Sequence, residues 1–180
     1  KEDYDPLINE FNPTRCDMRQ WMRTARDAGM QYVLFTAKHH DGFCLYDSAY
    51  TDFKSTNSPA GRDFVREFLD AAREYGLRAG LYFSIIDWRH PDFPHYGDKQ
   101  HPMRNDPAYG NENRDFNRYL DFFHAQVKEV CSNYGKLDLI WFDFSYDDLR
   151  GGSLAGTGVD GEGALLPAGR GHQHRPGGHR

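Results

Sequence analysis

Residues 17–36 read DMRQWMRTARDAGMQYVLFT, and this stretch decides the fold class. Asp17, followed by Gln20 three residues later, has the pattern of a helix N-cap. Apolar residues then recur at helical spacing, as far as a helix-ending glycine, at Met18, Trp21, Met22, Ala25 and Ala28. Residues 32–36 (YVLFT) form a short apolar run, which is typical of a strand buried on both faces. A helix that leads directly into a buried strand predicts a parallel sheet.

The same pattern of a helix followed by a strand occurs twice more along the chain. A second helix is predicted with Asp63 as its cap; it ends at Gly76 and is followed by a strand at 79–84. A third helix ends at Gly135 and is followed by a strand at 137–143. The apolar stripes of these two helices consist of Val65, Phe68, Leu69 and Ala72 in the second and Phe116, Tyr119, Leu120, Phe123, Val127 and Val130 in the third.

Three helix–strand units fit either a doubly wound sheet or part of a (β/α)8 barrel, and their spacing does not decide between the two. The glycines of a dinucleotide-binding fingerprint are absent after the strands, and the connections there are long and rich in aromatic residues. We therefore predict an α/β fold, a partial (β/α)8 TIM-like barrel of about three units, over residues 1–150.

Residues 151–180 differ sharply in composition from the rest of the chain. They contain ten of the eighteen glycines and no aromatic residue, and they show neither a helical nor a strand period. Two explanations stay open: a disordered low-complexity tail, or a frameshift or incorrect gene-model end. The three histidines of this segment, His172, His174 and His179, are assigned nothing beyond adventitious metal binding.

Composition and charge exclude several classes of protein. The net charge of −5 is spread along the chain, which argues against a nucleic-acid partner, and no apolar run approaches the roughly 20 residues of a membrane span. We expect a soluble protein. The three cysteines form no CxxC pair, so we expect buried thiols rather than disulfides or a zinc site. The chain begins at Lys1 without an apolar leader, and we predict neither a localisation nor an oligomeric state.

Polar and aromatic residues gather directly after each predicted strand. These clusters are residues 38–43 (KHHDGF), residues 82–84 (YFS) with 87–91 (DWRHP), and residues 141–143 (WFD). Barrel enzymes place their active sites at the carboxyl ends of the strands, so we expect the three clusters to converge. Aromatic residues make up 15% of the chain, as sugar-binding clefts often require, and Trp88, Trp141 and Tyr46 either pack in the core or line such a cleft.

The roles of individual residues in these clusters stay open at this point. The His39–His40 pair allows three interpretations. One histidine faces the core and the other faces solvent, or both bind substrate hydroxyls, or both bind zinc. We disfavour zinc because adjacent histidines are expected to point in different directions. Asp143 ends a buried strand, where an ionised carboxylate is costly without a partner. This carboxylate either pairs with a cation, or caps the next helix, or acts as a nucleophile. Asp138, at the other end of that strand, is expected to be structural.

Several motifs closely resemble glycoside hydrolase family 29, the α-L-fucosidases, over most of residues 15–146. The matching segments are TAKHHDGFCLYDS (36–48), YTDF (50–53), Arg62-Asp63, GLYFS (80–84), DWRHP (87–91) and WFD (141–143). The resemblance implies a (β/α)8-like catalytic barrel and hydrolysis of terminal α-L-fucose by double displacement, with no metal and no cofactor. It also implies that Asp143 is the nucleophile and that the substrate-binding residues are His39, His40, Tyr82 and Trp141.

A retaining glycosidase needs a second carboxylate as its acid/base. In the family this residue is a glutamate some tens of residues beyond the nucleophile; Glu162 is available by position, but its surroundings match nothing and we do not assign it. We therefore expect the 180-residue chain itself to be inactive, with a fucosylated oligosaccharide or glycoconjugate as the substrate of the parent enzyme. The alternatives are a non-catalytic fucose-binding or structural remnant and a metal-dependent hydrolase that uses His39, His40 and Asp143.

Overall fold

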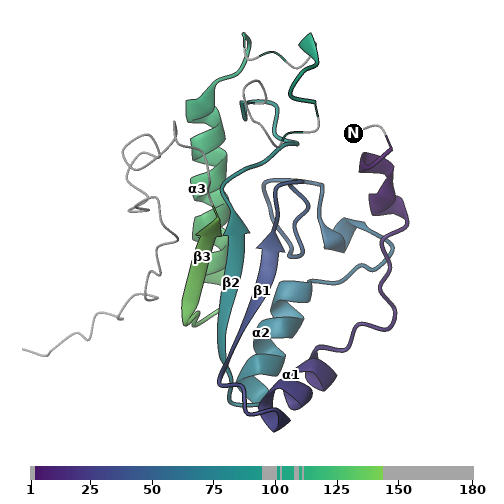
Figure 1. Cartoon of the computed structure of the whole chain (residues 1–180), viewed down its shortest axis with the longest axis vertical. Helices are drawn as coiled ribbons and strands as arrows, with labels where there is room; N and C mark the ends of the chain where they lie inside the picture. The colour runs from purple at the N-terminus through teal and green to yellow at the C-terminus, as the bar shows by residue number, and fades with distance from the viewer. Residues whose placement is uncertain (1–2, 95–100, 102, 108–109, 111, 144–180) are drawn as a thin grey trace, which may run out of the picture.

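The computed structural model describes residues 3–94, 101, 103–107, 110 and 112–143, which form an α/β structure in which helices and strands alternate (Figure 1). In chain order the elements are η1 (Asp5–Asn9), α1 (Met18–Asp27), β1 (Tyr32–Lys38), η2 (Ser55–Asn57), α2 (Phe64–Glu74), β2 (Arg78–Ser84), α3 (Phe116–Asn133) and β3 (Leu139–Asp143). The three predicted helix–strand units are therefore present. The expected tail at 151–180 lies outside the described residues.

The three strands form one parallel sheet, as predicted, and their order in it is β1-β2-β3. Gly80 of β2 lies opposite both Leu34 and Leu139, and the space between the strands is narrow there, because a Cβ on Gly80 would lie 2.8 Å from Leu139 Cβ. The register between β1 and β2 shifts near the end of β1: Thr36 pairs with Tyr82, but Lys38 pairs with Phe83. This irregularity turns Lys38 to the same face of the sheet as Phe83.

Each α-helix begins with an aspartate cap, which confirms the two predicted caps and adds a third. The carboxylates of Asp17, Asp63 and Asp115 accept backbone N–H groups of the first turn and so satisfy donors that have no partner within the helix. Gly29 and Gly76 follow α1 and α2 with φ angles of 80° and 70°, a left-handed conformation that glycine adopts without steric penalty.

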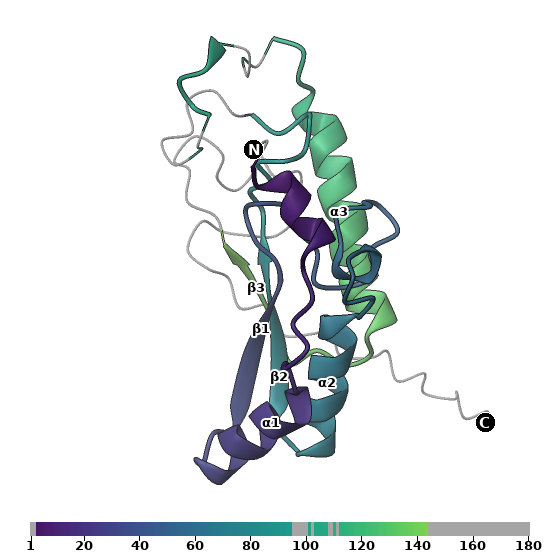
Figure 2. The same ribbon diagram turned by 90° about the vertical axis from the view of Figure 1, so that its right-hand side faces the viewer.

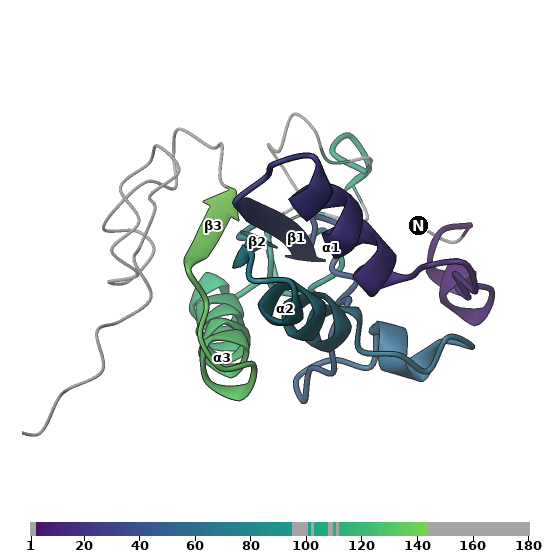
Figure 3. The same cartoon turned by 90° about the horizontal axis from the view of Figure 1, so that it is seen from below.

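Helices α2 and α3 cover one face of the sheet, as Figures 2 and 3 show. Phe35 of β1 stacks on Phe68 of α2, with ring centroids 4.9 Å apart. Phe123 of α3 contacts both Phe83 and Phe142 edge-on. Phe68, Phe83, Phe123 and Phe142 belong to the buried hydrophobic core, where full burial of each stabilises the fold by roughly 1.5–3 kcal/mol, and Phe35 is partly buried against it.

The opposite face of the sheet is more open along β1 and β3, and for these two strands the expectation of burial on both faces is wrong, whereas most of the central strand β2 is buried. Tyr32 and Trp141 are 48% and 46% exposed. Trp21, placed by its spacing on the buried stripe of α1, is also 48% exposed, because α1 packs mainly against α2 and buries Met18, Met22 and Ala25 instead. Burial on both faces requires a second layer, and among the described residues helices cover one side only.

The cysteines are not all buried thiols: Cys44 is buried, Cys16 is partly exposed and Cys131 is exposed. Burial raises the pKa of the Cys44 thiol to about 12, so this group stays protonated. No helix in the described part of the chain combines the length and the apolar character that crossing a bilayer requires.

Candidate active site

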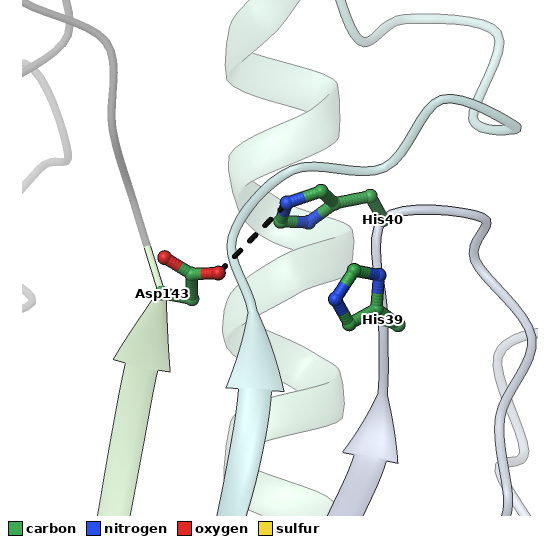
Figure 4. Close-up of side chains that lie close together, drawn as sticks. All are labelled: His39, His40 and Asp143. Atoms are coloured by element: carbon green, nitrogen blue, oxygen red, sulfur yellow. Dashed lines mark ion pairs between the residues drawn. The ribbon is translucent and has the colours of Figure 1, made fainter. Parts of the chain in front are cut away.

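The carboxyl ends of the three strands bring His39, His40 and Asp143 together (Figure 4). Asp143 is the last residue of β3, and the two histidines follow the last residue of β1. One potential ligand atom from each of the three residues lies within 4.8 Å of the others. Because parallel strands all end at the same edge of the sheet, residues that are about a hundred positions apart in the sequence meet here.

Tyr82 holds the carboxylate of Asp143. The Tyr82 hydroxyl donates a hydrogen bond of 2.5 Å to Asp143 Oδ2. Burial, together with this carboxylate, raises the pKa of Tyr82 well above its usual value, so the hydroxyl remains a donor at any ordinary pH. Trp141 lies beside Tyr82 in the register, and the two rings meet edge-on with centroids 6.2 Å apart. Asp143 is therefore oriented by a neighbour while its side chain remains 37% exposed.

His40 is fixed by Ser84, a residue to which the sequence motifs assign no role of its own. Ser84 Oγ donates its one hydrogen to the carbonyl oxygen of Ile86 at 2.8 Å. The 2.6 Å contact between Ser84 Oγ and His40 Nδ1 must then use a hydrogen on Nδ1. In neutral His40 the lone pair is consequently on Nε2, the nitrogen that lies 3.8 Å from Asp143 Oδ2.

His39 lies beside His40 and not on the opposite side of the chain. The two ring centroids are 4.2 Å apart, and the His39 ring stacks on Tyr82 at 5.4 Å. His39 is exposed and His40 is buried, yet both rings face the same site. The expectation that adjacent histidines point in different directions is wrong here because both residues follow the strand, where side chains no longer alternate.

A second polar cluster lies beneath these loops, within the core. Lys38 is fully buried, and its ammonium donates to Asp87 Oδ2 at 3.2 Å and to Gln126 Oε1 at 3.0 Å. The other oxygen of Asp87 accepts the backbone N–H groups of Arg89 and His90. The pair thus connects the end of β1, the loop after β2 and helix α3. The only signals for it in the sequence are a lysine at the end of an apolar strand and a glutamine within an apolar helix.

A cavity of about 360 Å³ opens beside His39. Its lining includes Trp88, Arg89, His101 and Tyr4, so Trp88 does line a hollow next to the site. Tyr46, the other aromatic residue considered as a cleft wall on this side, is instead fully buried in the core, where its ring contacts Phe83. Residues 91–107, which link β2 towards α3, are described only in part.

Known proteins resemble this chain along most of its length. The family model described as Alpha-L-fucosidase matches residues 1–161. Alpha-L-fucosidase 1 of Arabidopsis thaliana is 35% identical over 141 residues, which cover 77% of this chain and 24% of that protein. The structure of alpha-L-fucosidase isoenzyme 1 from Paenibacillus thiaminolyticus is 56% identical, with a TM-score of 0.83, and the similarity covers 86% of this chain and 37% of that one.

A third similar structure is a GH29 alpha-L-fucosidase from Bacteroides thetaiotaomicron, a trapped covalent intermediate. It is 33% identical with a TM-score of 0.66, and the similarity covers 79% of this chain and 30% of that chain. The chain thus spans 24 to 37% of the length of these three relatives. The family model reaches past the last described strand and includes every residue of the cluster around Asp143. By these matches, the chain belongs to the α-L-fucosidase family.

Proposed function

We propose that the full-length protein containing this chain is a retaining α-L-fucosidase in which Asp143 is the nucleophile. The observation that carries the proposal is the arrangement at the sheet edge: a partly exposed carboxylate held by Tyr82, with His39 and His40 beside it. Family membership supports the same substrate, a terminal α-L-fucose on an oligosaccharide or glycoconjugate.

The proposed architecture is a partial (β/α)8 barrel over residues 1–150, of which the described residues show three strands. In the part of the chain that the structure describes, the strands are parallel and in sequential order, and α2 and α3 cover the same face of the sheet, which is compatible with this arrangement. The strand edges that end the described sheet, and its open face, are then where the rest of a barrel would continue. Half of a doubly wound sheet has the same strand order, so the preference for a barrel rests on membership of the α-L-fucosidase family.

In the proposed reaction, Asp143 attacks the anomeric carbon of fucose. A bond forms between a carboxylate oxygen and this carbon, and the bond from the carbon to the leaving oxygen breaks. Tyr82 orients this carboxylate through its hydrogen bond to Oδ2. Water then releases fucose from the ester. The Bacteroides structure, trapped as a covalent intermediate in a glutamate-to-glutamine mutant, supports both the two steps and a glutamate partner.

The histidines and Trp141 bind the sugar in this proposal. His40 Nε2 accepts a hydrogen bond from a fucose hydroxyl when the ring is neutral, since Ser84 keeps the hydrogen on Nδ1. His39 offers a second polar atom beside it, and Trp141 an exposed ring. The acid/base carboxylate is not assigned, because the surroundings of Glu162 match nothing in the family and Glu162 lies outside the described residues. We therefore propose that the 180-residue chain alone does not hydrolyse fucosides.

The test is Asp143→Ala in the full-length protein, assayed on an aryl α-L-fucoside. We expect kcat to fall on the order of 10⁴-fold or more, as for other covalent nucleophiles, with unchanged thermal unfolding. Azide should restore turnover of the variant and give a fucosyl azide of inverted configuration. Asp121→Ala, which removes an exposed carboxylate from α3, is the matched control and should behave as wild type.

Two outcomes would contradict the proposal. Hydrolysis at the wild-type rate by Asp143→Ala would remove the nucleophile assignment. A full-length wild-type protein that binds fucose but never cleaves the fucoside would instead favour the non-catalytic fucose-binding function.

A further inference from the structure

The cluster at the sheet edge has the composition of a transition-metal site. Two imidazoles and one carboxylate offer donor atoms that all lie within 4.8 Å of one another. This set of ligands suits Zn²⁺, which proteins commonly bind through two histidines and a carboxylate with one position left for water. Adjacent histidines rarely achieve this; here it follows from the turn after β1, which places both rings side by side.

The orientation of His40 provides an independent observation that favours a metal ligand. Ser84 receives the Nδ1 hydrogen and passes its own to Ile86, so the lone pair of neutral His40 is on Nε2. That nitrogen faces Asp143. A hydrogen bond on the far nitrogen of the ring is the usual second interaction of a metal-bound histidine, since it fixes both the tautomer and the ring orientation.

The distances require only small movements. Two ligands at about 2.1 Å from zinc, separated by a tetrahedral angle, lie roughly 3.4 Å apart. His40 Nε2 and Asp143 Oδ2 are 3.8 Å apart, and the widest separation in the cluster is below 4.8 Å. His40 is held by Ser84 and Asp143 by Tyr82, while the His39 side chain is exposed, so rotation of His39 supplies most of the movement.

We propose that His39, His40 and Asp143 form an inhibitory site for Zn²⁺ or a similar transition-metal ion. The ion would occupy the carboxylate and the two imidazoles that the sugar needs, so it would act as a competitor of the substrate and not as a cofactor. The metal-binding part of this proposal is argued from the geometry of the three side chains. Its inhibitory effect rests on the function proposed above.

The first experiment measures binding without using activity. The full-length protein, freed of metal by a chelator, is titrated with Zn²⁺ in competition with a chromophoric zinc chelator. We expect one ion per chain, and at least about tenfold weaker binding in His39→Ala and in Asp143→Asn. Both replaced side chains are partly or fully exposed, so these variants should fold, which circular dichroism checks.

Two further variants show whether the geometry is right. Ser84→Ala removes no ligand but releases the His40 ring from its anchor, and it should weaken Zn²⁺ binding by about 10- to 100-fold. Replacement of His172, His174 and His179 together by alanine is the control for adventitious binding and should leave the site unchanged. Binding that survives His39→Ala and Asp143→Asn, or that disappears in the control, would overturn the proposal.

The second experiment tests competition. Zn²⁺ should raise the KM for an aryl α-L-fucoside without lowering kcat, a chelator should reverse the effect, and free fucose should weaken Zn²⁺ binding. Zinc that activates the protein, or inhibition that saturating substrate does not relieve, would contradict an inhibitory site. If the protein hydrolyses no fucoside yet binds Zn²⁺ through these residues, the site stands and the function proposed above fails.

Discussion

Lys38 and His39 are neighbours in the sequence, yet they lie in opposite environments. Lys38 is fully buried on the helix-covered side of the sheet, where Asp87 and Gln126 surround its ammonium. His39 is exposed and faces Asp143 on the open side. The difference shows that polar groups on the two sides of the sheet have different roles. Those on the covered side fix the loops, and those on the open side remain available for a ligand.

The loops are fixed because Asp87 contacts both of them. Its carboxylate accepts two backbone N–H groups from the loop after β2. It also lies against the loop after β1, where a Cβ on Gly42 would be only 2.6 Å from Asp87 Oδ1. Gly42 has a φ of 78°, so both its conformation and its surroundings require a glycine. The buried pair of Lys38 and Asp87 therefore fixes the loop after β1, which carries the two histidines.

The largest expected effect comes from breaking this pair. Lys38→Met leaves the Asp87 carboxylate buried without its cation, and we expect the free energy of unfolding to fall by about 3–5 kcal/mol. His39→Ala, one residue later, should change it by less than about 0.5 kcal/mol, because the ring is exposed. Urea unfolding of the two variants measures both values.

The double variant Lys38→Met/Asp87→Asn is the control for this comparison. Removing both charges should cost less than the sum of the single substitutions, since neither charge is then left alone. Equal losses in Lys38→Met and His39→Ala would show that the two environments do not differ in solution.

The second prediction extends the comparison to the two faces of the sheet. Phe83 is fully buried against α3, and Phe83→Ala should lower the free energy of unfolding of the chain by about 3–4 kcal/mol. Trp141 is 46% exposed on the other face, and Trp141→Ala should cost less than about 1 kcal/mol. Under the proposed barrel, Trp141→Ala costs more in the full-length protein than in the 180-residue chain. Equal costs in both would argue that no further layer covers this face.

The sequence predicts those features of the fold that depend on neighbouring residues. Asp17 and Asp63 cap their helices as expected, because a cap needs only the next three residues. The side of the sheet taken by Lys38 depends on the register between two strands, and its partner Asp87 is 49 positions away. The exposure of Trp21 depends on which element packs against α1. None of these long-range features can be read from a local pattern.

The residues of the candidate site could be predicted from the sequence, but the hydrogen bonds that orient them could not. The family motifs single out Asp143 and the histidine pair, and the structure brings them together. The role of Ser84 was not predictable, because it follows from a hydrogen bond to Ile86 that determines which nitrogen of His40 carries the hydrogen. The chemical roles of the predicted site residues remain predictions.

The smallest expected effect on the free energy of unfolding concerns the two carboxylates at the ends of β3. Asp138 accepts a hydrogen bond from the Ala79 N–H at 3.1 Å and pairs with Lys136 at 2.8 Å, whereas Asp143 is available for a ligand. The hydrogen bond with Lys136, followed by the one with Ala79, lowers the pKa of Asp138 in the folded chain.

Because the pKa of Asp138 is lower in the folded state than the unfolded value of about 3.9, its contribution is full above that value and is lost as the pH falls through the folded pKa. We expect Asp138→Asn to lower the free energy of unfolding by about 0.5–1 kcal/mol at pH 7, since solvent screens this pair. The difference from wild type should disappear in urea unfolding at pH values below the folded pKa. Asp143→Asn, measured in the same way, tests whether the other end of the strand is free of such a structural role. A difference between Asp138→Asn and wild type that persists unchanged into acid would mean that the substitution acts through packing and not through charge.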